Sequence, residues 1–243
     1  MKNKLFITLL LCASYFFGQN NNICIQEVLD YENRSGNLND TALAGKNVFL
    51  SYTVKVTDWD DESTISNVKI YKMGAETRFF SEQVNMYTNE REVIVEIPDQ
   101  KVIAINNTLP DAGSKQKADE FQELRKEFLD SCQVVSCESI GKNTKVLVLK
   151  VNPRQIQEGI KIVEMRYEYD TERKKVLQVK TTYHPDYKLK ALLMIYRDFN
   201  TESTYNFTAF KGHFIDRKGQ LTSKYKDYEL VDSRDKKAGS SKK

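Results

Sequence analysis

In the stretch "REVIVEIPDQKVIAI" (residues 91–105), apolar side chains recur at every second position on both sides of a Pro-Asp-Gln corner: Val93, Val95, Ile97, Ile103 and Ile105. Alternation with a period of two places successive side chains on opposite faces of an extended strand. A proline followed by polar residues ends such a strand and begins a turn. The stretch therefore predicts two antiparallel strands joined in a hairpin, with one face on a core.

Further strands are predicted on both sides of this hairpin. Short apolar or alternating segments precede it at residues 48–56, 65–73, 76–84 and 85–88, and others follow it at 145–151, 160–169, 175–183, 188–199 and 203–214. The sequences "DTERKK" and "HPDY" are typical of the tight turns that join antiparallel neighbours. The chain thus predicts about eleven strands in antiparallel order.

Two segments have helical spacing instead. "ICIQEVLDYENR" (residues 23–34) carries Ile25, Val28 and Leu29 on one side, and "KQKADEFQELRKEFL" (115–129) carries a longer apolar stripe. "DTALAGK" (40–46) is a candidate short helix with Asp40 as its cap. The fold class predicted is mainly β (α+β), with an N-terminal and a central helix.

The N-terminal sequence predicts export. "MKNKLFITLLLCASYFFGQ" places two lysines before an apolar run from Leu5 to Phe17, which is the pattern of a cleaved signal peptide over residues 1–19. The run of about 13 residues is shorter than the roughly 20 that a membrane helix needs, so no stable transmembrane insertion is expected. A retained signal anchor and acylation at Cys12 are the alternatives. The predicted location is the periplasm, and an extracellular or outer-membrane-associated location is also compatible.

Charge is nearly balanced in the predicted mature chain. Removing Lys2 and Lys4 from the 37 basic residues leaves 35 against 34 acidic residues. Binding to nucleic acid depends on clustered excess Lys and Arg, so no nucleic-acid partner is expected. Residues 20–232 contain no linker-like segment and are predicted to form one domain. The basic, small-residue end of the chain predicts a disordered tail over residues 233–243.

This order of elements resembles the outer-membrane lipoprotein carrier (LolA-like) half-barrel superfamily. The resemblance runs through residues 23–215 and is carried by three stretches: "VKIYKMGAETRFFSEQVNMYTNEREVIVEIPDQKVIAI" (68–105), "IVEMRYEYDTERKKVLQVKTTY" (162–183) and "KALLMIYRDFNTESTYNFTAF" (190–210). It implies a single curved antiparallel sheet, a half-barrel of about eleven strands, with the N-terminal and central helices covering its concave face.

Such a half-barrel implies a concave apolar surface that suits acyl chains or a hydrophobic segment of a partner. The candidate lining of this hydrophobic cavity is a set of alternating aromatic and aliphatic residues: Leu50, Tyr52, Val54, Met165, Tyr167, Tyr169, Leu193, Ile195 and Phe207. The alternative for each of them is a place in the packed core under the helices.

No motif predicts catalysis, a metal site or a cofactor. His184 and His213 have no second ligand at the spacing of a metal site. The acidic run "DWDDE" (58–62) lacks the glycine and the distal glutamate of a calcium loop, so a solvated turn between strands is favoured. Nucleophile elbows, phosphate-binding loops and dinucleotide fingerprints are absent from the sequence. The chain is therefore expected not to be an enzyme.

Three cysteines remain after the predicted cleavage: Cys24, Cys132 and Cys137. An odd number in an oxidising compartment leaves one thiol over. The short spacing of "CQVVSC" favours a Cys132–Cys137 disulfide. Pairing of Cys24 with either of the others is the alternative, and a set of reduced, buried thiols is a third possibility.

Two function classes follow from these observations. The first is a non-catalytic carrier or chaperone that holds a lipid or an acylated protein in the half-barrel. The second is an accessory subunit of a secretion or motility assembly that docks an envelope protein on the same fold. A carrier predicts an open apolar surface under a mobile helical lid. A docking subunit predicts a filled core and an exposed apolar patch elsewhere.

Overall fold

The computed structural model of the chain describes residues 23–32, 38, 43, 45–108, 114–207, 211–216 and 218–234. The predicted signal peptide, the last nine residues of the predicted tail and most of the candidate helix over residues 40–46 lie outside the described residues.

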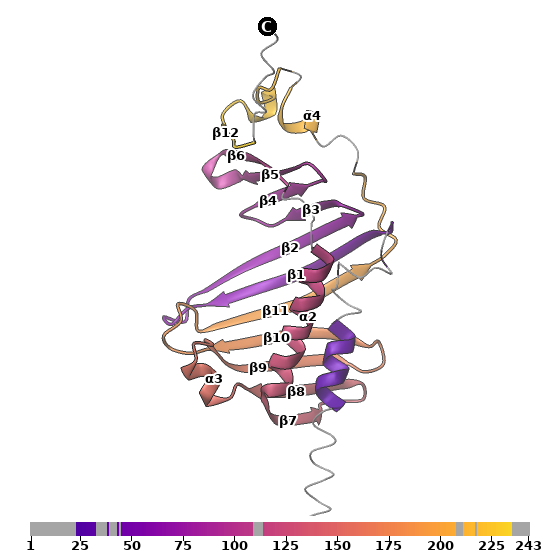
Figure 1. Cartoon of the computed structure of the whole chain (residues 1–243), viewed down its shortest axis with the longest axis vertical. Coiled ribbons are helices and arrows are strands. Elements are labelled where there is room, and N and C mark those ends of the chain that lie inside the picture. Colours follow the sequence, from indigo (N-terminus) through magenta and orange to yellow (C-terminus); the bar gives the residue numbers. More distant parts are fainter. Residues whose placement is uncertain are drawn as a thin grey trace, which may run out of the picture. The chain divides into compact units, whose positions relative to one another are not determined.

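Twelve strands in the described part of the chain belong to one sheet, in the order β12-β6-β5-β4-β3-β2-β1-β11-β10-β9-β8-β7 (Figure 1). The pairing of β12 with β6 is parallel, and neighbours along the chain such as β9 and β10 pair antiparallel. The predicted mainly β fold on a single sheet is confirmed. The strands are β1 (Asn47–Thr57), β2 (Ser63–Met73), β3 (Glu76–Phe80), β4 (Asn85–Thr88), β5 (Glu92–Ile97), β6 (Val102–Asn107), β7 (Gln133–Ser139), β8 (Thr144–Lys150), β9 (Ile162–Asp170), β10 (Lys175–Tyr183), β11 (Ala191–Asn200) and β12 (Glu229–Asp232).

The two main predicted helices are present. The N-terminal helix covers residues 23–32, and the central helix is α2 (Ser114–Ser131). Shorter helical segments are η2 (Pro98–Gln100), α3 (Pro153–Gln157), α4 (Lys211–Phe214) and η3 (Ser223–Tyr225). The acidic run at residues 58–62 forms the turn between β1 and β2, as predicted, because the Asp58 carboxylate accepts hydrogen bonds from the backbone of Asp60 and Glu62.

The strand predicted over residues 203–214 is wrong. Residues 203–207 have no regular structure, and α4 follows at Lys211. Side chains replace a neighbouring strand as hydrogen-bond partners here: Asn47 donates to the carbonyl oxygen of Tyr205, and Arg78 donates to that of Phe207. The polar backbone of this segment is therefore satisfied without ladder pairing.

Tertiary contacts divide the chain into two compact units. Unit 1 comprises Met1–Asn37, Thr53–Ile65 and Lys115–Arg197. Unit 2 comprises Leu38–Tyr52, Ser66–Ser114 and Asp198–Lys243.

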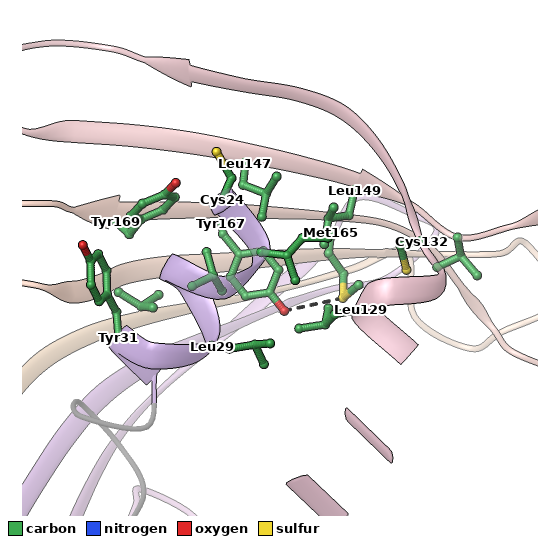
Figure 2. Packing of buried hydrophobic residues seen from close by; sticks show 14 residues of the cluster. Cys24, Leu29, Tyr31, Leu129, Cys132, Leu147, Leu149, Met165, Tyr167 and Tyr169 are labelled. Carbon is green, nitrogen blue, oxygen red and sulfur yellow. Dashed lines mark hydrogen bonds between the residues drawn. The ribbon is translucent and has the colours of Figure 1, made fainter. Parts of the chain in front are cut away.

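The core of unit 1 lies between the N-terminal helix, the end of α2 and strands β8 and β9 (Figure 2). Val28 and Leu29 of the helix share this core with Leu147 of β8 and Tyr167 of β9. Polar contacts at its edge also hold the helix: Glu32 pairs with Arg125 of α2, and Glu27 lies 2.9 Å from the ammonium of Lys145. Burial raises the pKa of the Glu32 carboxyl, although the Arg125 charge acts in the opposite direction.

The predicted Cys132–Cys137 disulfide is wrong, because Cys137 is bonded to Cys24. Cys137 lies within β7, whereas Cys132 precedes the strand and its thiol donates to the Phe128 carbonyl of α2. The chain between the two cysteines is therefore a strand and not a closed loop. The remaining thiol of Cys132 is buried, which raises its pKa to about 11.

The core of unit 2 confirms the predicted hairpin. β5 and β6 pair antiparallel around η2, with Ile94 opposite Ile105. These isoleucines pack with Phe214, Ile215 and Tyr225 from the C-terminal part of the chain. Ordered pairing continues past β12, because Arg234 forms an ion pair of 2.8 Å with Glu92. Residue 234 lies two positions beyond the predicted end of the domain.

Candidate functional site

An apolar row crosses six strands of unit 2 without interruption. The strand registers place Ile70 opposite Phe79, Phe79 opposite Met86, and Met86 opposite Val95. They continue with Val95 opposite Ala104, and Ala104 opposite Val231. Side chains that face each other across a sheet lie on the same face. We call these residues the apolar row: Ile70, Phe79, Met86, Val95, Ala104 and Val231.

The apolar row lies on the face of the sheet opposite to the core of unit 2. Ile94 and Ile105, which belong to that core, alternate in the chain with Val95 and Ala104. Successive side chains of a strand point to opposite faces. Members of the row are only partly buried, and Val231 is 40% exposed, so water reaches the row.

Two of the predicted cavity residues flank this row. Phe49 stacks on Tyr71 with 4.8 Å between ring centroids, so these two side chains share the core face. Leu50 and Ile70, their neighbours in sequence, therefore share the opposite face. Tyr52 follows Leu50 on the same face of β1. Leu50 is buried and Tyr52 is half-buried. These two predicted candidates lie next to the row on its β1 side.

The row has one polar and one apolar border. On one side, the next register positions are Lys72, Thr77, Thr88 and Asn106, with Val93 among them. On the other side, Ile97 pairs with Val102, and only the β12 end of this border is charged, where Glu229 pairs with Val102. An apolar row with polar side chains along one border suits an elongated apolar ligand that has a polar end or edge.

The length of the row follows from sheet geometry. Neighbouring strands lie about 4.8 Å apart, so five intervals between six strands give a row of about 24 Å. Half of the hydrocarbon thickness of a bilayer, about 15 Å, is the depth that one acyl chain occupies. The row is therefore long enough for one extended acyl chain.

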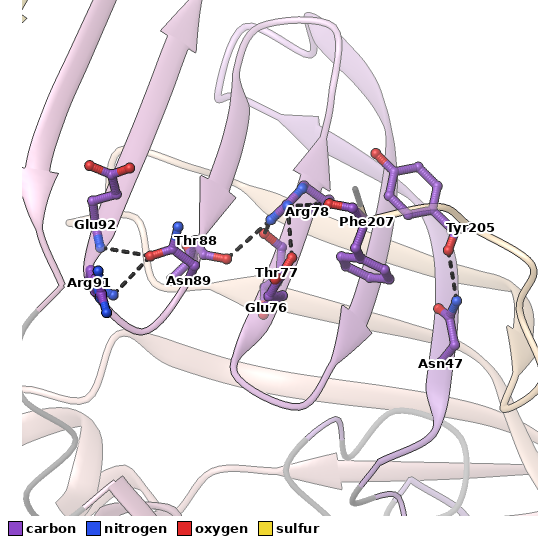
Figure 3. Close-up of polar contacts among 10 residues, drawn as sticks. All are labelled: Asn47, Glu76, Thr77, Arg78, Thr88, Asn89, Arg91, Glu92, Tyr205 and Phe207. Atoms are coloured by element: carbon purple, nitrogen blue, oxygen red, sulfur yellow. Dashed lines mark hydrogen bonds and ion pairs between the residues drawn. The ribbon is translucent and has the colours of Figure 1, made fainter. Parts of the chain in front are cut away.

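The opposite, core face of unit 2 is held together by a buried arginine (Figure 3). Arg78 is 2% exposed and lies 2.9 Å from the Glu76 carboxylate. Its guanidinium also donates to the carbonyl oxygens of Thr77, Thr88 and Phe207. The Phe207 ring lies 5.3 Å from the guanidinium carbon. Phe207, a predicted cavity residue, therefore belongs to this packed network and not to the apolar row.

Polar partners also explain why the core face of β5 carries two glutamates. Glu92 and Glu96 are buried on the same side as Ile94. Arg234 neutralises Glu92, and the Asn85 amide donates to Glu96 at 3.1 Å. Because these carboxylates are paired, β5 can present Val93, Val95 and Ile97 on its other face.

The predicted residues of unit 1 do not form one surface. Met165, Tyr167 and Tyr169 are at most 5% exposed and fill the core under the N-terminal helix (Figure 2). Leu193 and Ile195 lie on the opposite face of the sheet. The register shows this, because Val179 is opposite both Tyr167 and Met194, whereas Leu193 is opposite Lys180. Val54, in β1, is half-buried.

All six residues of the apolar row were missed by sequence reasoning, which found only Leu50 and Tyr52 beside it. The relevant signal is the phase of the hairpin, which depends on the length of its connection. Four residues, 98–101, separate Ile97 from its partner Val102, so Val95 lies opposite Ala104 and not on the same face as Ile103. In β5, the buried face carries Glu92 and Glu96, whereas the other, partly exposed face carries only apolar residues. An outward side of this kind is a stronger sign of a binding surface than a single exposed residue.

Within the described residues, no group of three or more His, Cys, Asp or Glu side chains is placed to hold a metal ion. No described helix combines the length and the apolar character needed to cross a membrane.

No family model matches the chain, and no curated protein matches it. Solved structures do show similarity. One is an uncharacterized conserved protein from Thermus thermophilus, with 9% identity, 85% of this chain and 98% of that chain covered, and a TM-score of 0.39. A putative outer membrane lipoprotein-sorting protein domain from Vibrio parahaemolyticus has 8% identity, coverage of 75% and 95%, and a TM-score of 0.32. A LolA superfamily protein from Nitrosomonas europaea has 8% identity, coverage of 75% and 94%, and a TM-score of 0.29.

Proposed function

We propose that the protein binds a hydrophobic ligand, the acyl chain of a lipid or of a lipidated protein, without catalysis and in the cell envelope. The observation that carries this proposal is the apolar row, which crosses six strands of unit 2 on a face that water reaches. An apolar surface of this extent in contact with water is typical of a ligand or partner site. The predicted signal peptide supports the location.

The expected energy of binding is sufficient for a stable complex. Each methylene group transferred from water to an apolar surface contributes about 0.8 kcal/mol, so ten of them supply about 8 kcal/mol before the cost of ordering. The side chains of the row, five of them aliphatic or thioether and one aromatic, offer no conventional hydrogen bonds to the middle of a ligand. Selectivity would therefore come from ligand length and from the polar border.

A fluorescent fatty-acid probe tests the proposal when it is titrated into the wild-type protein and two variants. Phe79→Glu places a carboxylate in the middle of the row. Val135→Glu is the matched control, because Val135 is an exposed apolar residue of strand β7 in unit 1 and belongs neither to the row nor to its borders. We expect Phe79→Glu to weaken probe binding at least about tenfold, since an acyl chain over a carboxylate leaves that charge without water.

The control variant should bind the probe within about twofold of the wild type, as surface substitutions usually have small effects. Absence of probe binding to the wild type contradicts the proposal. Equal losses in both variants contradict the assignment to the row. Circular dichroism and urea unfolding confirm that each variant is folded.

A protein partner is the second candidate function. It is favoured by the filled core of unit 1, in which the predicted cavity residues Met165, Tyr167 and Tyr169 are buried. In this case an apolar segment of an envelope protein, and not a lipid, covers the row. Native mass spectrometry of protein purified from its own envelope separates the two, because a bound lipid adds the mass of a small molecule and a bound partner adds that of a polypeptide.

A further inference from the structure

A second candidate site lies on the core face of unit 2, opposite to the apolar row. It is a hollow of about 410 Å³. This volume falls within the range of about 300–1,000 Å³ that small-ligand sites occupy. Its lining combines aromatic and polar residues: Phe49, Tyr71, Asn200, Glu202, Ser203, Thr204 and Tyr205.

The aromatic part of the lining is a stack of three rings. Tyr71 stands between Phe49 and Tyr205, with centroid separations of 4.8 and 4.1 Å and interplanar angles of 30° and 22°. The edge of Phe80 supports Tyr71 from a further strand. Because both faces of Tyr71 are covered, the stack is a rigid wall, and Phe49 at its end keeps one face that the stack does not use.

The polar part of the lining is pre-formed by hydrogen bonds in residues 200–205. The Asn200 side chain accepts from the backbone of Glu202, and the Ser203 hydroxyl accepts from the backbone of Tyr205. Asn47 of β1 fastens this segment. Its side-chain amide donates to the Tyr205 carbonyl oxygen (Figure 3), and its backbone carbonyl oxygen accepts from the backbone N–H of Ser203. A pre-formed site loses less entropy when a ligand binds.

The chemistry of the lining selects the class of ligand. Its polar segment offers the amide of Asn200, the carboxylate of Glu202 and the hydroxyl groups of Ser203 and Thr204, which together both donate and accept hydrogen bonds. None of the described lining residues is a lysine or arginine, the usual partners of an anionic ligand. A quaternary ammonium ion is recognised by several open ring faces around it, whereas Tyr71 has both faces occupied.

We propose that this hollow binds a neutral sugar ring. The apolar C–H face of the ring packs on the aromatic wall, and its hydroxyl groups bond to Asn200, Glu202, Ser203 and Thr204. The site is separate from the apolar row, because Tyr71 and Ile70 are neighbours in β2 and point to opposite faces. Sugar binding is thus independent of acyl-chain binding.

Saturation-transfer NMR with the full mature chain tests the proposal. The probes are three neutral trisaccharides, namely maltotriose, cellotriose and tri-N-acetylchitotriose, together with tetramethylammonium and methyl phosphate, two ions whose methyl protons the experiment can detect. We expect at least one trisaccharide to bind with a Kd below about 10 mM, and the two ions to give no signal. Binding of no trisaccharide, or a stronger signal from either ion, overturns the proposal.

Variants locate the binding. Glu202→Ala removes an exposed acceptor of the rim and should weaken saccharide binding about fivefold or more, the effect of one lost hydrogen bond to a charged group. Glu90→Ala is the matched control, since Glu90 is an exposed glutamate that lines a different hollow of unit 2. Phe49→Ala should abolish the signal. Equal affinities of Glu202→Ala and Glu90→Ala would overturn the assignment, and Phe79→Glu should bind the saccharide like the wild type.

Discussion

Cys24 of the N-terminal helix is bonded to Cys137 of β7, 113 residues later in the chain. The bond fastens the start of the helix to unit 1, while the ion pair between Glu32 and Arg125 holds its other end against α2. The helix that covers Tyr167 and Tyr169 is thus held at both ends, which explains why these predicted cavity residues are part of a packed core.

The disulfide should contribute strongly to stability. A cross-link over more than a hundred residues restricts the unfolded chain, and we expect the double variant Cys24→Ser/Cys137→Ser to lose about 2–5 kcal/mol in free energy of unfolding. Urea unfolding followed by circular dichroism measures this loss. Cys132→Ala is the control and should lose about 1 kcal/mol. An unfolding midpoint that a reducing agent leaves unchanged would speak against the bond.

The two faces of β9–β11 predict opposite outcomes for two substitutions. Tyr167→Ala empties a core position that is 2% exposed and should cost about 3–5 kcal/mol. Leu193→Glu should cost less than about 1 kcal/mol, because Leu193 pairs with Lys180, which in turn pairs with Arg166, so a carboxylate gains cationic neighbours. Thermal unfolding compares them. A Leu193→Glu variant that fails to fold would show that this position is core.

His213 predicts a pH dependence of stability in unit 2. Its Nε2 lies 3.0 Å from the Lys224 ammonium and 3.0 Å from the Tyr225 hydroxyl. Desolvation, with the Lys224 charge, lowers the pKa of His213 below its ordinary value of 6.5, although Glu96 acts in the other direction. As the pH falls through 6.5, the unfolded chain gains a proton that the folded chain does not. The contribution of His213 to the free energy of unfolding is therefore fully present above pH 6.5 and is lost as the pH falls through the lower folded-state pKa.

NMR titration of the two histidines measures this effect, and the variant His213→Gln assigns the signals because it removes one of them. We expect a titration midpoint for His213 below 6.5, and a weaker acid-side loss of stability in His213→Gln than in the wild type. A midpoint at or above that ordinary value would contradict this account of the contacts around His213.

Local patterns in the sequence were sufficient for most elements. The alternation in residues 91–105 predicted the β5–β6 hairpin, and the apolar stripes predicted the N-terminal helix and α2. Residues 203–214 also alternate, yet their described part at 203–207 forms no strand, because Asn47 and Arg78 supply hydrogen bonds that no local pattern encodes. The short strand β12 was missed for a similar reason, since its pairing with β6 is parallel and long-range.

The candidate site was harder to predict because it depends on register. A sequence shows which residues alternate, but not which of two faces is covered. Leu193 and Tyr167 have the same apolar character, yet one lies opposite Lys180 and the other in the core. Likewise, the spacing of Cys132 and Cys137 suggested a loop where β7 places a strand.

The location of a bound acyl chain tests the central claim most directly. A fatty acid that carries a photoreactive diazirine group is bound to the wild-type protein and irradiated, and the cross-linked peptides are identified by mass spectrometry. The account predicts cross-links at the apolar row, in peptides that contain Phe79, Met86 and Val95. Cross-links confined to peptides with Met165, Tyr167 or Leu193, or none above the level of the Phe79→Glu variant, would contradict it.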